Sequence, residues 1–212
     1  MYKKAKTWIS NNPDLSFAIL LSICVYAYFA FTNDLFATHR TGYAIMERFA
    51  VLGLVGLALT LCIIAGEIDL SIGSNAALAA VVVVRFTDSL GAPTSIFIAI
   101  VISTLVGAIQ GYFIAYLRVR AIVLTVGTLM LLRGVALFAA QEKTVMLTDF
   151  RVPDFISTKM FIYFSPASLL VIAIFILVGL FMTYTRYGRE IYAIGGARKE
   201  AVAAGVNLKR PM

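Results

Sequence analysis

Long apolar runs separated by short polar segments constrain this chain more than any other feature of its sequence. A helix needs about 20 apolar residues to cross roughly 30 Å of hydrocarbon. Five runs reach or approach that length: 15–32, 49–65, 96–117, 121–140 and 165–183. Since 61% of the 212 residues are hydrophobic and only 14% are charged, an ordinary soluble domain is excluded. We expect an all-α integral membrane protein.

A sixth apolar run, 76–84, is too short to cross alone, because its nine residues cover only about 14 Å of helix. The preceding segment, 66–74, reads Gly-Glu-Ile-Asp-Leu-Ser-Ile-Gly-Ser. Irregular backbone at membrane depth is tolerated only where it is buried in protein or lines a cavity. The sequence therefore predicts about six spans with a broken, partly polar joint near 66–75, where Ser71 caps the helix that follows.

Charged and hydroxyl side chains mark a substrate path at this joint. A charge at the bilayer centre costs at least about 2.5 kcal/mol, so Glu67 and Asp69 must face protein, water or a cation. Arg133, about 12 residues into its span, either pairs with one of these carboxylates or acts in transport. Gln110 either hydrogen-bonds another helix or lines the path. The predicted path residues are Glu67, Asp69, Ser71, Ser74, Thr125, Thr128 and Arg133.

The basic residues predict the orientation of the chain. With six spans and a cytoplasmic N-terminus, eleven of the eighteen Lys and Arg residues lie inside, six lie outside, and Arg133 lies within a span. This distribution satisfies the positive-inside rule and explains the net charge of +7 without nucleic acid. We expect a single transmembrane domain over 1–212, with cytoplasmic residues 1–14, membrane spans over 15–184 and a cytoplasmic loop over 185–212.

Enzymatic and metal sites have little support in the sequence. Glu67 and Asp69 form a carboxylate pair, yet no nucleophile or histidine accompanies them in a catalytic arrangement. There is one histidine and no Cys/His cluster, so neither a metal nor another cofactor is expected. The sequence also lacks a Gly-x-x-x-x-Gly-Lys-Ser/Thr phosphate loop. If ATP drives this protein, another chain must bind it.

The final inner segment contains a possible docking element. Residues 198–204 favour a short helix, with Gly195 and Gly196 as a flexible entry and Gly205 as a stop. One interpretation is a solvated loop. The other is a helix on the membrane surface that fits a groove on a partner.

Three ordered blocks resemble the permease subunits of the ribose-type family of bacterial ABC importers, the branch for simple sugars and autoinducer-2. Residues 66–74 resemble the family's Gly-Gly-Ile-Asp-Leu-Ser-Val-Gly-Ser signature, except that Glu67 replaces a common Gly. Residues 123–134 are similar to the second block, and residues 187–205 are similar to the third. Within the third, Glu200-Ala201-x-x-x-Gly205 matches the loop that forms the coupling helix on the ATPase.

The resemblance implies a permease that imports a simple sugar or small polyol into bacteria across the inner membrane, without enzymatic chemistry of its own. It implies as partners an ABC ATPase subunit, a periplasmic sugar-binding protein and a second permease chain. The residues implied in ATPase coupling are Arg198, Lys199, Glu200, Ala201 and Gly205. Family members continue with further spans, so the chain resembles the N-terminal part of a permease.

Two other functions fit parts of the pattern. An ion-coupled secondary transporter also combines broken helices with charges near the membrane midplane. A noncatalytic membrane assembly subunit is the third interpretation. ATP-independent uptake would favour the former, and assembly with partners but without transport would favour the latter.

Overall fold

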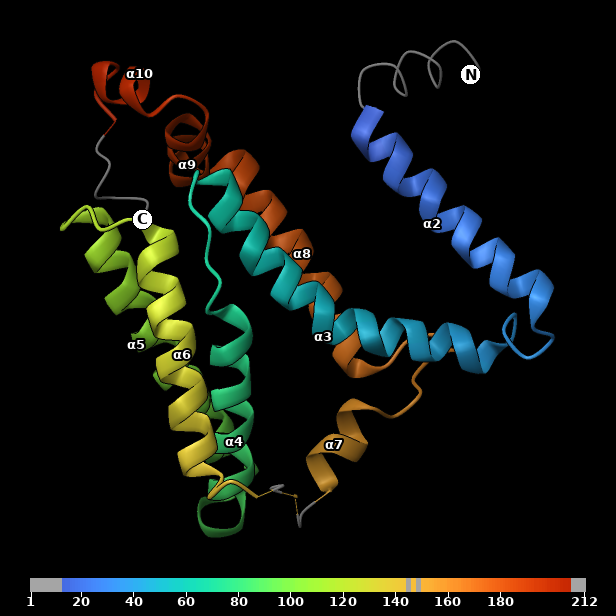
Figure 1. Ribbon diagram of the computed structural model, residues 1–212. Coiled ribbons are helices and arrows are strands. Elements are labelled where there is room, and N and C mark those ends of the chain that lie inside the picture. The colour runs from blue at the N-terminus through green and yellow to red at the C-terminus, as the bar shows by residue number, and fades with distance from the viewer. Residues whose placement is uncertain (1–12, 144–145, 148–149, 207–212) are drawn as a thin grey trace.

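The computed structural model describes residues 13–143, 146–147 and 150–206, and all regular structure within them is helical (Figure 1). The helices are α2 (Pro13–Thr32), α3 (His39–Ile64), α4 (Ile72–Leu90), α5 (Ala92–Ala115), α6 (Ala121–Ala139), α7 (Arg151–Ile156), α8 (Pro166–Tyr184), α9 (Arg186–Gly196) and α10 (Arg198–Ala203). Among the described residues, α2, α3, α5, α6 and α8 are long and apolar enough to cross a membrane. The expected all-α membrane fold is confirmed.

A helix, α4, lies where the sixth span was predicted and extends well beyond the apolar run, but it is not among the helices apolar enough to cross a membrane. Helix α4 has 19 residues, which correspond to about 28 Å. Polar groups near both ends find partners: the Asn75 side chain donates to the Ser103 carbonyl of α5, at 3.4 Å, and the Thr87 hydroxyl donates to the Val83 carbonyl, at 2.6 Å. Hydropathy alone underestimates this helix because it does not register such contacts.

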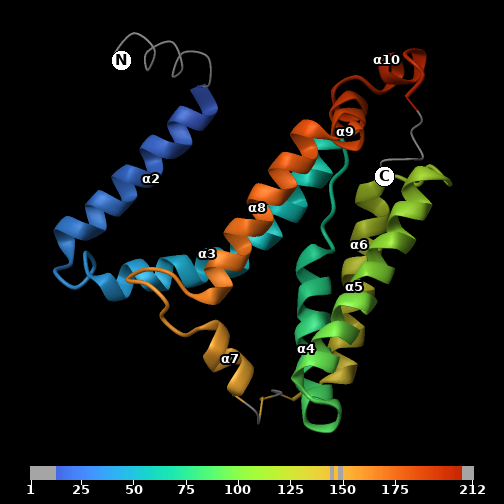
Figure 2. The ribbon, with the colours of Figure 1, turned by 180° about the vertical axis from the view of Figure 1, so that it is seen from behind.

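Helices α4, α5 and α6 pack side by side as one unit (Figures 1 and 2). Their core contains Leu78 and Val82 from α4, Ala99 from α5, and Leu132 and Ala136 from α6. Alanine at the contact positions lets neighbouring helix backbones approach closely. This unit forms one side of the joint between α3 and α4.

Helices α3 and α8 form a second unit, with α9 and α10 at its end (Figures 1 and 2). The rings of Phe49 and Phe175 lie 5.6 Å apart between α3 and α8. At the end of α3, a Cβ on Gly195 would overlap the Ile64 carbonyl oxygen. The prediction of a flexible entry at Gly195 and Gly196 was wrong, because both residues belong to α9 and Gly195 permits close packing.

The helices alternate in direction, so the predicted inner segments share one end of the molecule. That end holds the start of α2, the connection between α5 and α6, and helices α9 and α10, whereas α7 lies toward the opposite end (Figure 1). Helix α2 stands apart from the other spans (Figures 1 and 2). Most of the predicted cytoplasmic N-terminus, residues 1–12, and the last part of the predicted inner loop, residues 207–212, lie outside the described residues.

Candidate functional site at the joint between α3 and α4

The predicted break between two helices is confirmed, and α4 begins short of the end of the neighbouring α5. Helix α3 ends at Ile64 and α4 begins at Ile72, and an extended segment connects them (Figure 1). Gly66 adopts a φ of 81°, a left-handed conformation that glycine adopts at low cost. Helices α4 and α5 meet at Gly91 and have 19 and 24 residues. Because α4 is five residues shorter, it begins about 7.5 Å short of the end of α5, which leaves room for the joint.

A buried network of hydrogen bonds fixes the joint to α5. Asp69 Oδ1 accepts from both the backbone N–H and the hydroxyl of Ser71, each at 2.7 Å. Gln110 Nε2 then donates to the Ser71 hydroxyl oxygen at 2.8 Å, which confirms that Gln110 bonds another segment. Ser71 does not cap α4 through its side chain as predicted, because its hydroxyl serves Asp69 and Gln110 instead. The network satisfies polar groups that would be costly to bury alone.

Helix α6 contacts the same joint through Thr125. This side chain is almost fully buried, at 1% exposure, and its hydroxyl lies 3.4 Å from the carbonyl oxygens of both Ile68 and Ile122. Ser74, in the first turn of α4, is also buried. Thr128 donates within its own helix, to the Leu124 carbonyl at 3.0 Å. Thr125 thus belongs to the joint, whereas the hydroxyl of Thr128 bonds within α6.

The proposed pairing of Arg133 with a joint carboxylate was wrong. Glu67 Oε1 instead accepts from the Arg198 guanidinium of α10 at 2.9 Å, and Asp69 binds Ser71. Arg133 lies 12 residues beyond Ala121, the first residue of α6, or about 18 Å along the helix. Ile122 at the start of α6 lines the same pocket as Glu67, so Arg133 is too far along α6 to reach it.

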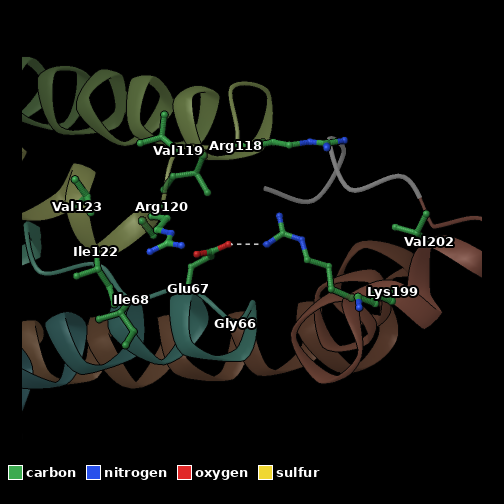
Figure 3. A pocket seen from close by; sticks show the side chains of 14 residues that line it. Gly66, Glu67, Ile68, Arg118, Val119, Arg120, Ile122, Val123, Lys199 and Val202 are labelled. Atoms are coloured by element: carbon green, nitrogen blue, oxygen red, sulfur yellow. Dashed lines mark hydrogen bonds and ion pairs between the residues drawn. The ribbon is translucent and has the colours of Figure 1, made fainter.

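A pocket of about 990 Å³ opens beside the joint (Figure 3). Its volume lies at the upper end of the usual range for small-molecule sites, about 300–1,000 Å³. The joint, the facing ends of α5 and α6, and α10 form its walls. Its charged lining residues are Glu67, Arg118, Arg120, Arg198 and Lys199. Carboxylate and guanidinium groups can bind the hydroxyls of a polar solute.

The two arginines at the connection between α5 and α6 were not among the predicted path residues. Arg118 and Arg120 entered the sequence argument only as orientation charges, yet both line this pocket. Arg118 has a positive φ of 56°, which is uncommon for a residue with a side chain. Hydropathy placed these two residues at the end of an apolar span but did not predict their proximity to Glu67.

The predicted docking element forms a short helix beside this pocket. Helix α10 spans Arg198–Ala203, and Gly205, with a φ of 82°, follows its end. Ala201 is buried at 5% exposure, whereas Arg198, Lys199 and Glu200 are exposed. One face of α10 therefore packs on the protein, whereas its charged side chains are exposed, with Arg198 paired to Glu67.

Residues 43–212 match the family described as "Branched-chain amino acid transport system / permease component". The chain belongs to this permease family. It is 26% identical to the autoinducer 2 import system permease protein LsrC of Photorhabdus luminescens, over 93% of this chain and 60% of that protein. It is 24% identical to the fructose import permease protein FrcC of Rhizobium meliloti, over 99% of this chain and 61% of that protein.

A third relative of this permease is LsrC of Klebsiella pneumoniae, 32% identical over 94% of this chain and 58% of that protein. The resemblance to the simple-sugar and autoinducer-2 branch is confirmed by these relatives. The chain spans about 60% of the length of the curated relatives that it matches. No solved structure matches it significantly. Family and helices together support a multi-pass protein of the inner membrane.

Proposed function

We propose that this chain is a membrane permease subunit of a bacterial ABC importer for a simple sugar or related small polyol. The observation that carries the proposal is the hydrogen-bonded break between α3 and α4, which opens into a pocket bordered by α10. Family membership and the curated relatives named as import permeases for autoinducer 2 and fructose support it.

Transport in this proposal proceeds by alternating access. The N-terminus is cytoplasmic, so the pocket faces the cell interior and α7 lies on the periplasmic side. A periplasmic binding protein delivers the sugar on the side of α7. A second permease chain completes the pathway. The chain itself carries out no chemistry, since a separate ATPase subunit hydrolyses ATP.

The residues of the joint divide into two groups in this proposal. Glu67 lines the pocket and remains a proposed path residue, with its carboxylate paired to Arg198. Asp69, Ser71 and Thr125 position the joint, because their hydrogen bonds are made within the protein. Ser74, Thr128 and Arg133 remain proposed path residues farther along α4 and α6.

ATPase coupling is assigned to the exposed face of α10, formed by Arg198, Lys199 and Glu200, with Ala201 and Gly205 shaping the helix. Replacing Glu200 with Ala removes an exposed carboxylate without emptying a core position. We expect this variant to lose most copurification with the ATPase subunit. Assembly is measured by affinity pull-down from solubilised membranes.

The matched control is Asp154→Ala, which removes an exposed carboxylate in α7, toward the opposite end of the molecule (Figure 1). It should leave ATPase binding unchanged. Equal recovery of the ATPase with Glu200→Ala and with wild type would contradict the coupling assignment.

A further inference from the structure

We propose that the ion pair between Glu67 and Arg198 transmits the movement of α10 to the joint between α3 and α4. This inference rests on the function proposed above and identifies a pair of positioning residues for it. Glu67 Oε1 and Arg198 Nη1 lie 2.9 Å apart, although 131 residues separate them in the sequence. Figure 3 shows Glu67 beside the pocket, with a dashed line that marks this interaction.

Hydrogen bonds also connect the joint to two spans, α5 and α6. Ser71 links it to Gln110 of α5, and Ile68 lies against Thr125 of α6. Glu67 is one residue from Ile68 and two residues from Asp69 in an extended segment. A displacement of the Glu67 side chain is therefore passed through a short stretch of backbone to residues that contact α5 and α6.

The link between α9 and α10 offers a hinge for α10 in this proposal. Helix α9 is held against the end of α3, because Gly195 approaches the Ile64 carbonyl too closely for any side chain. Between α9 and α10 stands one residue, Ala197, with an extended φ of −156° and ψ of 82°. A change in the dihedral angles of a single residue can reorient α10. The ion pair would then carry that change to the joint.

The exposure of the pair indicates a role in coupling more than in folding. The side chains of Arg198 and Glu67 are 45% and 23% exposed, and ion pairs in contact with solvent contribute little to stability. Loss of the pair should therefore leave the protein folded. Loss of the pair should instead reduce transport, because transport in this proposal requires α10 and the joint to move together.

The test measures cargo molecules transported per ATP hydrolysed, in vesicles that contain the permease, its ATPase subunit and its binding protein. The variants are Glu67→Gln, Arg198→Gln and the charge exchange Glu67→Arg with Arg198→Glu. Each single variant should lower this ratio by at least about fivefold, the lower end of typical coupling between sites. Copurification with the ATPase is measured for each variant, so that the ratio is compared among assembled complexes, and the charge exchange should restore most of the ratio.

Arg186→Gln is the matched control. Arg186 pairs with Glu190 at 2.8 Å within α9, so its loss removes an inner ion pair that does not reach the joint. Its transport ratio should equal that of wild type. If Glu67→Gln does not assemble, Arg198→Gln breaks the same pair from its more exposed side.

Two results would overturn the inference. One is an unchanged transport ratio when either partner is replaced. The other is a charge-exchange variant whose loss of transport ratio, expressed as a free energy, equals the sum of the losses in the two single variants. No pairwise interaction between the two side chains would then exist. If the wild type shows no ATP-driven uptake, the proposed function itself fails. If the wild type shows ATP-driven uptake and the variants keep the same ratio, only the ion-pair inference fails.

Discussion

The Ser71 hydroxyl takes part in two hydrogen bonds of the joint, one to Asp69 and one from Gln110. In Ser71→Ala, the Gln110 amide loses its hydrogen-bond acceptor, Ser71 Oγ, in a buried site. Leaving such a group unpaired costs about 1–3 kcal/mol. We expect the free energy of unfolding, measured in mixed detergent micelles, to fall by that amount.

The control for this prediction is Thr104→Ala on the same helix as Gln110. The Thr104 hydroxyl is exposed and donates only within α5, to the Ile100 carbonyl. Its loss should change the unfolding free energy much less. Equal effects of the two substitutions would show that the Ser71 network does not stabilise the joint.

Sequence reasoning found the residues of the joint more reliably than their partners. Asp69, Ser71 and Thr125 were predicted as substrate-path residues, and the structure brings all three together at the joint. The partner of Glu67 was missed, since Arg198 follows 131 residues later in a separate short helix. Apolar periodicity gives the depth of a residue in the membrane but not the neighbouring element at that depth. Arg133 was wrongly paired for this reason.

At the scale of elements, the contact between α9 and the end of α3 depends on Gly195. A Cβ there would overlap the backbone of Ile64, whereas a Cβ on Gly196 would meet nothing within 4 Å. Gly195→Ala must therefore separate the two helices, because backbone atoms cannot move aside locally. We expect a loss of about 1–3 kcal/mol in unfolding free energy, typical of overpacking.

Gly196→Ala supplies the comparison for Gly195→Ala in the same unfolding measurement. It makes the same chemical change one position later and should be neutral or slightly stabilising, because alanine favours a helix over glycine. If Gly195→Ala were equally well tolerated, the tight approach of α9 to α3 would be refuted.

Elements with local signals were predicted well, and elements that depend on tertiary contacts were not. The short helix α10 and its end near Gly205 followed from local propensity and were confirmed. Helix α4 was predicted too short, because its polar ends are stabilised by contacts such as that of Asn75 with α5. Gly195 was read as flexible, since its packing role is visible only when α9 lies on α3.

At the scale of the whole molecule, the joint lies between two helical units. Helices α4, α5 and α6 form one unit, and α3, α8 and α9 form the other. The pocket is bordered by the joint, α5, α6 and α10, so a change in the relative position of the units would alter its walls. This arrangement suits a permease that alternates between two open states.

The most direct test of the proposed function is sugar uptake into vesicles that contain the permease with its candidate ATPase subunit and binding protein. We predict uptake that requires ATP and persists when sodium and proton gradients are dissipated. Uptake driven by an ion gradient without the ATPase would contradict the importer and indicate a secondary transporter. Assembly with the ATPase but no uptake under either condition would also contradict it and indicate a noncatalytic assembly subunit.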